Sequence, residues 1–197
     1  TICHLILCVY NPILRLNWAM AIRIAVYTPD SLPESFRVVV DNITRELLKL
    51  GCDVIAFSRI DESLASADVV WDPRAGGGVP PVEELCRLHL PQVITSHGVA
   101  PMALPAFEYF GSIRGAIRGS LRNRTKKKAW RDLESGYAAV VSVSCFSASN
   151  ICDVLPINPA KVSWCYNAID HALFSAPESG EYASGAKYFF HISNGEP

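Results

Sequence analysis

The residue of this chain best suited to chemistry is His97, which comes at the end of an apolar run. The run begins at Pro91, is rich in β-branched side chains, and is followed by Gly98. A buried strand of a parallel sheet has this composition. Ligands of open α/β sheets bind outside the carboxyl ends of the strands, so His97 would stand at the rim of that crevice. Gly98 would let the backbone approach a ligand closely. A histidine that merely caps a strand is the alternative.

A glycine triplet supplies a second candidate site. Gly76, Gly77 and Gly78 follow a short apolar segment at 67–71 that is expected to form a strand. The backbone N–H groups of such a loop can cradle a phosphate. However, the loop has neither a G-x-G-x-x-G nor a Walker pattern, and two prolines follow closely. A flexible loop beside the cleft is therefore an equal alternative.

A basic cluster lies within an expected helical region at 105–136. Its members are Arg114, Arg118, Arg122, Arg124, Lys126, Lys127, Lys128 and Arg131. Interleaved with them are Ile113, Ile117, Leu121 and Trp130. Both a solvated helix face and a surface for an anionic partner would explain this pattern. Eight positive charges in eighteen residues exceed what solubility needs, which favours the anionic partner: a phospholipid surface or a phosphorylated acceptor, ahead of RNA.

Metal and disulfide chemistry are not indicated. The seven cysteines are odd in number, form no C-x-x-C pair, and lie mostly inside apolar runs. They are typical of small core residues in a reducing compartment, so no zinc site is expected and the predicted location is cytoplasmic. The residues in question are Cys3, Cys8, Cys52, Cys86, Cys145, Cys152 and Cys165.

Composition places the chain among globular proteins rather than disordered ones. Of its 197 residues, 50% are hydrophobic and 19% are charged, enough to bury a substantial core. The formal net charge is −1, so no field of the whole chain points to nucleic acid, and local patches must carry any such claim.

Strands and helices that alternate along the chain must position these side chains. Strands are expected at 22–28, 53–57, 67–71, 91–96, 137–143 and 162–166. Helices are expected at 36–50, where Gly51 provides the stop, at 82–90, within 105–136, and from the N-cap Ser144 to residue 155. This order predicts an α/β fold: a Rossmann-like, doubly wound, mostly parallel sheet with flanking helices.

Taken in order, these stretches resemble a known family. A strand ends in His97-Gly98 and a basic helical region follows; then come A-V-V-S-V-S-C-F-S at 139–147 and V-S-W-C-Y-N-A-I-D at 162–170, with Phe174 after them. This looks like the N-terminal half of a family 4 (group 1) retaining glycosyltransferase of the GT-B fold. There, a strand reads roughly v-S-x-x-S/T before a helix, and the next strand ends in N-G-V/I-D-x-x-x-F. The resemblance covers residues 22–174.

The resemblance implies roles for individual residues. His97 matches the family histidine at the cleft, near the transferred sugar, and is the candidate catalytic residue. Ser144 matches the serine at the head of the next cleft helix. Asn167 and Asp170 match the largely structural Asn and Asp of the crossover between domains. The implied activity is hexosyl transfer from a nucleotide sugar, a substrate rather than a cofactor, to an acceptor held by this domain. The basic helical region would hold an anionic or lipid-linked acceptor, or dock on the membrane surface.

The chain departs from the family pattern at two places. Ala168 stands where the family has the glycine of N-G-V-D. Residues 28–34 contain no glycine, whereas the family's first strand is followed by a glycine-rich loop that approaches the donor diphosphate. The triplet Gly76 to Gly78 is the candidate substitute for that loop.

The resemblance also suggests a division of the chain. Residues 1–19 are expected to be an extension outside the fold, with a membrane-associated segment as the alternative. Residues 20–174 would form the acceptor-side domain, 175–187 have a linker's composition, and 188–197 would begin a truncated donor-binding domain. The family's nucleotide pocket and its E-x7-E glutamates belong to that second domain. The polypeptide alone is therefore expected to be inactive.

A binding module of a different class is the main alternative. In it, a stand-alone α/β domain would grip anionic membrane or nucleic acid through its basic helix, and nucleic acid is the less expected partner. Peripheral membrane contact is compatible with both hypotheses. A GT-B enzyme of another chemistry, such as a sugar-nucleotide epimerase, is a third possibility, and N-A-I-D at 167–170 argues against it.

Overall fold

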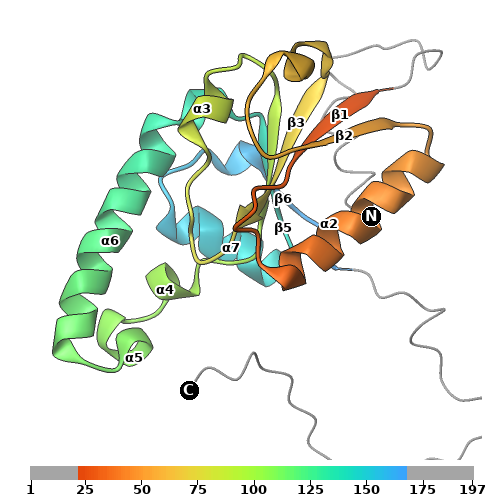
Figure 1. Cartoon of the computed structure of the whole chain (residues 1–197). Helices are drawn as coiled ribbons and strands as arrows, with labels where there is room; N and C mark the ends of the chain where they lie inside the picture. Colours follow the sequence, from red (N-terminus) through yellow and green to blue (C-terminus); the bar gives the residue numbers. More distant parts are fainter. Residues whose placement is uncertain (1–21, 168–197) are drawn as a thin grey trace, which may run out of the picture. The chain divides into compact units, whose positions relative to one another are not determined.

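Six parallel strands form one sheet in the computed structural model, which describes residues 22–167 (Figure 1). Their order across the sheet is β2-β1-β3-β4-β5-β6, and every neighbouring pair is parallel. The strands are β1 (Arg23–Tyr27), β2 (Asp53–Phe57), β3 (Val69–Ala75), β4 (Gln92–Ser96), β5 (Ala139–Ser142) and β6 (Val162–Trp164). The sheet confirms the predicted Rossmann-like α/β fold.

Helices connect the strands of this sheet. They are α2 (Glu34–Lys49), α3 (Glu83–Cys86), α4 (Ala100–Ala103), α5 (Ala106–Phe110), α6 (Ile113–Asp132) and α7 (Cys145–Val154). Short 3-10 helices are η1 (Glu62–Ser66), η2 (Glu134–Gly136) and η3 (Pro159–Lys161). Within residues 22–167, none of the helices has the length and apolar character that crossing a membrane requires.

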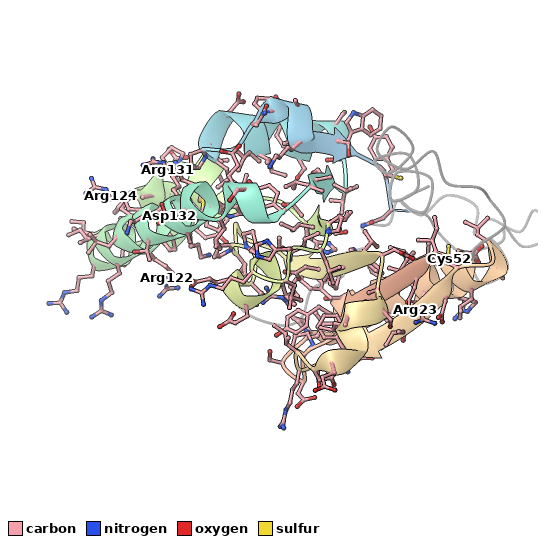
Figure 2. The ribbon with its side chains drawn as sticks, turned by 90° about the horizontal axis from the view of Figure 1, so that it is seen from above. Arg23, Cys52, Arg122, Arg124, Arg131 and Asp132 are labelled. Atoms are coloured by element: carbon pink, nitrogen blue, oxygen red, sulfur yellow. The ribbon has the colours of Figure 1, made fainter. Side chains whose placement is uncertain are left out.

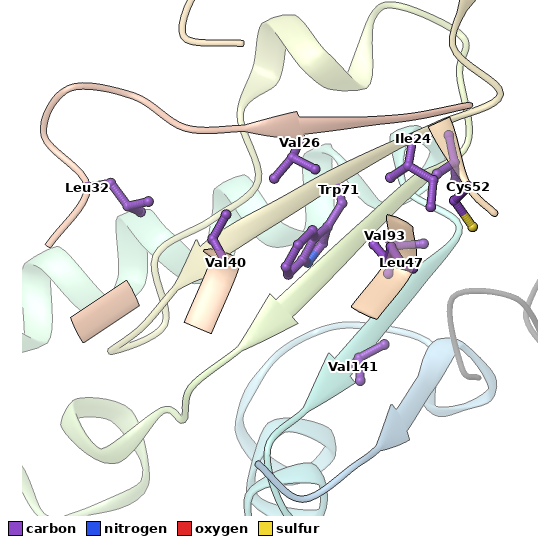
Figure 3. Packing of buried hydrophobic residues seen from close by; sticks show 10 residues of the cluster. Ile24, Val26, Leu32, Val40, Leu47, Cys52, Trp71, Val93 and Val141 are labelled. Carbon is purple, nitrogen blue, oxygen red and sulfur yellow. The ribbon is translucent and has the colours of Figure 1, made fainter. Parts of the chain in front are cut away.

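One face of the sheet is covered by α2. Val26, Trp71 and Val93, from β1, β3 and β4, pack with Val40 and Leu47 of that helix (Figure 3). The apolar residues of α2 recur at helical spacing, and the helix gives way at Gly51, whose φ of 81° suits glycine. The expected helix and its glycine stop are both confirmed.

The opposite face carries the remaining packing. Successive side chains of a strand point to opposite faces, so the neighbours of the first set turn away from α2. Ala25 and Val70 pack with residues of η1 and α3. Ile94 and Val140 pack with Trp130 of α6 and with α7. Helices on both faces of a parallel sheet are what the doubly wound prediction requires.

Strand β3 differs from its prediction. The sequence predicts a strand at 67–71 with Asp72 opening a loop, but the strand runs from Val69 to Ala75. The pairing with β4 shifts between Asp72 and Ala75, so the strand contains a bulge. Pro73 lies in the bulge, where a residue without an N–H group is tolerated inside a sheet.

Two helical predictions also change in extent. The helix expected at 82–90 is confined to the four residues of α3. The helical region expected at 105–136 is divided at Gly111, whose φ of 67° ends α5 before α6 begins. The predicted extension at 1–19, the linker at 175–187 and the further domain at 188–197 lie outside the described residues.

A buried hydrogen bond joins the centre of the sheet. Trp71 is fully buried, and its indole Nε1–H donates to the Thr95 hydroxyl on the neighbouring strand at 2.8 Å. Both side chains belong to the most buried part of the molecule, where a polar hydrogen without a partner is costly.

Replacing Thr95 by valine tests that cost. Thr95→Val keeps the side-chain shape but leaves the Trp71 indole N–H without an acceptor, so the free energy of unfolding should fall by about 1–3 kcal/mol. The control is Thr125→Val on α6, where an exposed hydroxyl donates to the Leu121 carbonyl and the change should stay within about 0.5 kcal/mol. Urea unfolding measures both, and equal stabilities for the two variants would contradict the prediction.

Candidate functional site

The strand order creates a crevice between β1 and β3. From β1 the chain moves to β2 on one side, then crosses to β3 on the other side of β1. The connections that leave β1 and β3 therefore diverge, and ligands of open α/β sheets bind at such a switch point, outside the carboxyl ends of the strands. The structure has a cavity of about 330 Å³ at this position. Its walls include Pro29, Ser31 and Phe36 after β1, and Arg74, Gly76 and Val79 from β3 and the loop beyond it.

His97 is the first residue after β4 and adjoins this cavity through Phe36. The two rings are stacked, with centroids 4.2 Å apart and planes 14° from parallel. The ring Nε2 lies 2.9 Å from the Pro73 carbonyl oxygen in the bulge of β3. Because a carbonyl only accepts, Nε2 carries the hydrogen and Nδ1 carries the lone pair when the ring is neutral.

The surroundings of His97 favour the neutral ring. Burial lowers the pKa of His97 below its usual value, and the hydrogen bond to the Pro73 carbonyl opposes that shift only in part. None of the described residues donates a hydrogen bond to Nδ1. The side chain is therefore equipped to accept a hydrogen bond from a ligand, such as one from a hydroxyl group.

Arg74 is a site residue that the sequence analysis missed. Its Nε and Nη2 each donate to the Asp72 carboxylate at 2.9 Å, and Asp72 is 1% exposed. The guanidinium also lies 5.0 Å from the centroid of the Tyr27 ring. These contacts fix its plane at the cavity wall, while Nη1 has no partner among residues 22–167. A donor held in this way can meet a carboxylate or phosphate oxygen.

A signal for Arg74 was present in the sequence. Asp72 and Arg74 are two residues apart, a spacing that places both on one face of a strand. The proline between them favours a loop in place of a strand, which hides the pair in the sequence.

Two N–H groups of the glycine triplet already donate hydrogen bonds within the protein. Gly76 N–H donates to the Arg74 carbonyl at 2.6 Å, and Gly78 N–H donates to the Gly98 carbonyl at 3.2 Å. Gly77 and Gly78 adopt φ values of 57° and 72°. A phosphate cradle that used the N–H groups of Gly76 and Gly78 would require another conformation of this loop, so that role stays a prediction.

Helix α6 holds the same loop from outside. Lys126 Nζ donates to the Gly77 carbonyl at 2.8 Å, and the buried Trp130 Nε1–H donates to the Gly78 carbonyl at 3.2 Å. Burial, with a smaller effect of Arg122, lowers the pKa of Lys126. This lysine therefore points toward the loop and away from the surface on which the sequence analysis placed it.

The other members of the basic cluster point differently from Lys126. Figure 2 shows the side chains of Arg122 and Arg124 directed outward from α6. Lys127 is half-buried, and Lys128 pairs with Asp132 at 3.7 Å. The exposed members are Arg114, Arg118, Arg122, Arg124, Lys128 and Arg131.

The remaining predicted site residues lie along the same edge of the sheet. Gly98 adopts a φ of 119°, and a Cβ at this position would come within 3.3 Å of the Ser147 hydroxyl at the start of α7. Ser144 follows β5, and its hydroxyl accepts from Ser147 N–H at 3.1 Å, which confirms it as the N-cap of α7. Asn167 is exposed just after β6, and Asp170 lies outside the described residues.

A pH titration tests the environment of His97. The folded pKa lies below the usual value of about 6.5, so the unfolded chain takes up the proton first as the pH falls. The contribution to stability is complete above about pH 6.5 and is lost as the pH drops toward the folded pKa. Nuclear magnetic resonance of the ring proton should therefore report a pKa below 6.5. Phe36→Ala, which exposes the ring, should raise that pKa; an unshifted value in the wild type would contradict the assignment.

Residues 22–167 contain no group of three or more histidine, cysteine or acidic side chains that could hold a metal ion.

Comparison with protein-family models, curated proteins and solved structures found no match for this chain. The family resemblance therefore stays a prediction, and what is shown is a Rossmann-like α/β fold with a cavity at its switch point.

Proposed function

We propose that this chain is the acceptor-side half of a retaining glycosyltransferase that moves a hexosyl group from a nucleotide sugar to an acceptor. The observation that carries the proposal is the position of His97 just after β4: its Nε2–H is engaged, its Nδ1 has no partner among the described residues, and its ring stacks on Phe36, which lines the cavity at the switch point. Among the residues that carry the family resemblance, His97, Ser144 and Asn167 lie in the part of the chain that the structure describes. In support of it, all three follow neighbouring strands at one edge of the sheet.

The cavity suits a sugar because it combines few polar groups with apolar walls. Sugar hydroxyls donate hydrogen bonds, and the open Nδ1 of His97 would accept one of them. Phe36 and Val79 provide carbon surface against which the C–H groups of a sugar ring would pack. Arg74 would face a more acidic group of the donor or acceptor. The cavity volume of about 330 Å³ is at the lower end of the range for small-molecule sites.

In this proposal, this chain positions the sugar, and a donor-binding domain activates it for transfer. Transfer requires that the leaving diphosphate be stabilised and that water be excluded when two domains close. His97 would orient the sugar at the cleft, and the residues that bind the nucleotide would come from the donor-binding domain. The proposed location is the cytoplasm, because the described cysteines are all free thiols.

The test is turnover by the full-length gene product. The assay measures transfer of labelled sugar from a panel of nucleotide sugars. His97→Ala should lower kcat by about 10²-fold, because a misplaced sugar loses the reactive geometry.

The matched control is His89→Asn, at the opposite edge of the sheet, just before β4. Residue 89 has a φ of 55°, a conformation that asparagine tolerates, so this variant should retain wild-type turnover. Thermal melting confirms that both variants fold. Wild-type turnover by His97→Ala, or no transfer from any nucleotide sugar, would refute the proposal.

A further inference from the structure

The outward face of α6 carries an apolar stripe where a surface helix usually carries polar residues. Ile113, Ile117 and Leu121 are spaced by four residues, so they lie on one face. Their exposed fractions are 71%, 59% and 58%. In an ordinary amphipathic helix the apolar stripe faces the core, but here it faces away from it.

The helix cannot rotate to bury this stripe, because its inner face is fixed. Gly119 packs against Phe110 of α5 so closely that a Cβ at residue 119 would overlap the phenyl ring. Further along, Asn123 Nδ2 donates to the Pro101 carbonyl at 2.6 Å. Lys126 and Trp130 hold the glycine loop. The outward direction of the stripe is therefore built into the packing.

Positive charge borders the stripe along one side and at its end. On an α-helix with 3.6 residues per turn, Arg114 and Arg118 flank the stripe on one side, and Arg124 follows it one turn beyond Leu121. Arg124 lines a shallow groove of about 300 Å³ with Ile117 and Leu121. The first acidic residue of α6 is Asp132, in its last turn. Figure 2 shows the long basic side chains extending from α6 into solvent.

The neighbouring helix α5 also exposes apolar side chains. In α5, Phe107 is 59% exposed and Tyr109 is 44% exposed, and Leu104 just before it is also exposed. Aromatic and aliphatic side chains bordered by arginines are the composition of a helix that lies in a membrane interface. A nucleic-acid surface would need polar and basic groups where the three aliphatic side chains stand.

We propose that α5 and the first half of α6 dock on an anionic phospholipid surface, with Ile113, Ile117 and Leu121 inserted among the acyl chains. The flanking arginines would contact lipid phosphates, and Phe107 and Tyr109 would lie at headgroup level. This inference is independent of sugar transfer, since it rests on the exposed side chains of α5 and α6 and not on His97 or the cavity.

The direction of α6 relates this surface to the cavity. β4 ends at the carboxyl edge of the sheet and β5 begins at the opposite edge, so α6 runs from the first edge toward the second (Figure 1). Its first residue, Ile113, lies about 15 Å along the helix axis before Asn123, which contacts α4. Docking would therefore bring the carboxyl edge toward the bilayer. If the proposed function holds, a lipid-linked acceptor in the bilayer would lie close to the carboxyl edge of the sheet.

The experiment measures co-sedimentation of the full chain with vesicles. One set is phosphatidylcholine alone, and the other contains about 30% phosphatidylglycerol. The chain should bind the anionic vesicles at least about tenfold more tightly, and added salt should weaken that binding. Equal binding to both vesicle types, or none to the anionic ones, would overturn the proposal.

Variants with matched controls locate the surface. The pair Ile117→Ser and Leu121→Ser should weaken vesicle binding at least about tenfold, and so should Arg114→Glu with Arg118→Glu. The apolar control pairs Val38→Ser with Leu48→Ser, two exposed residues of α2, and the charge control pairs Arg45→Glu with Arg59→Glu. Both control pairs should bind as the wild type does.

Further measurements distinguish a membrane from other partners of this surface, and membrane docking from sugar transfer. Tighter binding to a single-stranded RNA oligonucleotide than to anionic vesicles would overturn the proposal. A dimer that the Ile117 and Leu121 variants dissociate, without vesicle binding, would also overturn it. His97→Ala should bind vesicles like the wild type, so loss of sugar transfer and loss of membrane docking are measured separately.

Discussion

The bulge in β3 determines the geometry of the carboxyl edge. Between Asp72 and Ala75 the strand advances three residues while β4 advances two, so one residue is in excess. That irregularity offers the Pro73 carbonyl to the His97 ring and aims Arg74 at the cavity while Asp72 stays buried. In a regular strand the Pro73 carbonyl would pair within the ladder and would not be offered to a side chain that follows β4. The bulge lies at the switch point, so the irregular backbone and the divergent connections act at the same place.

Helix α6 connects this edge to the outer surface. Its second half holds the glycine loop through Lys126 and Trp130, whose bonds end on the carbonyls of residues 77 and 78. Its first half carries Ile113, Ile117 and Leu121 outward. The same helix therefore contacts the glycine loop and carries the apolar stripe. A ligand that binds the loop and a surface that binds Ile113, Ile117 and Leu121 would both act on α6. The basic cluster thus contains a lysine that faces inward and holds the loop, Lys126, and arginines that face solvent.

Local patterns in the sequence were sufficient for much of the fold. The strand at 53–57 has the bounds that its composition predicted, and Gly51 and Ser144 end and begin helices as their chemistry indicates. The site was less accessible. The stack of Phe36 on His97 joins segments far apart in the chain, and the bulge depends on pairing with β4, which composition does not encode. Lys126 could have been recognised, since it lies four residues before Trp130 and therefore shares its inward face.

The state of His97 restricts what it can contribute to the proposed sugar transfer. A ring with a lowered pKa and an Nε2–H committed to the Pro73 carbonyl is poorly suited to donate a proton, but it can accept a hydrogen bond through Nδ1. Arg74 is restricted in a similar way. The Asp72 carboxylate offsets the charge of its guanidinium, so the main contribution that Arg74 can make is one oriented N–H donor. Neither group would neutralise a diphosphate. Under the proposed function, the developing charge must therefore be met by another domain, and the contribution of this one is to place a sugar, at an edge that docking through α6 would turn toward the lipid.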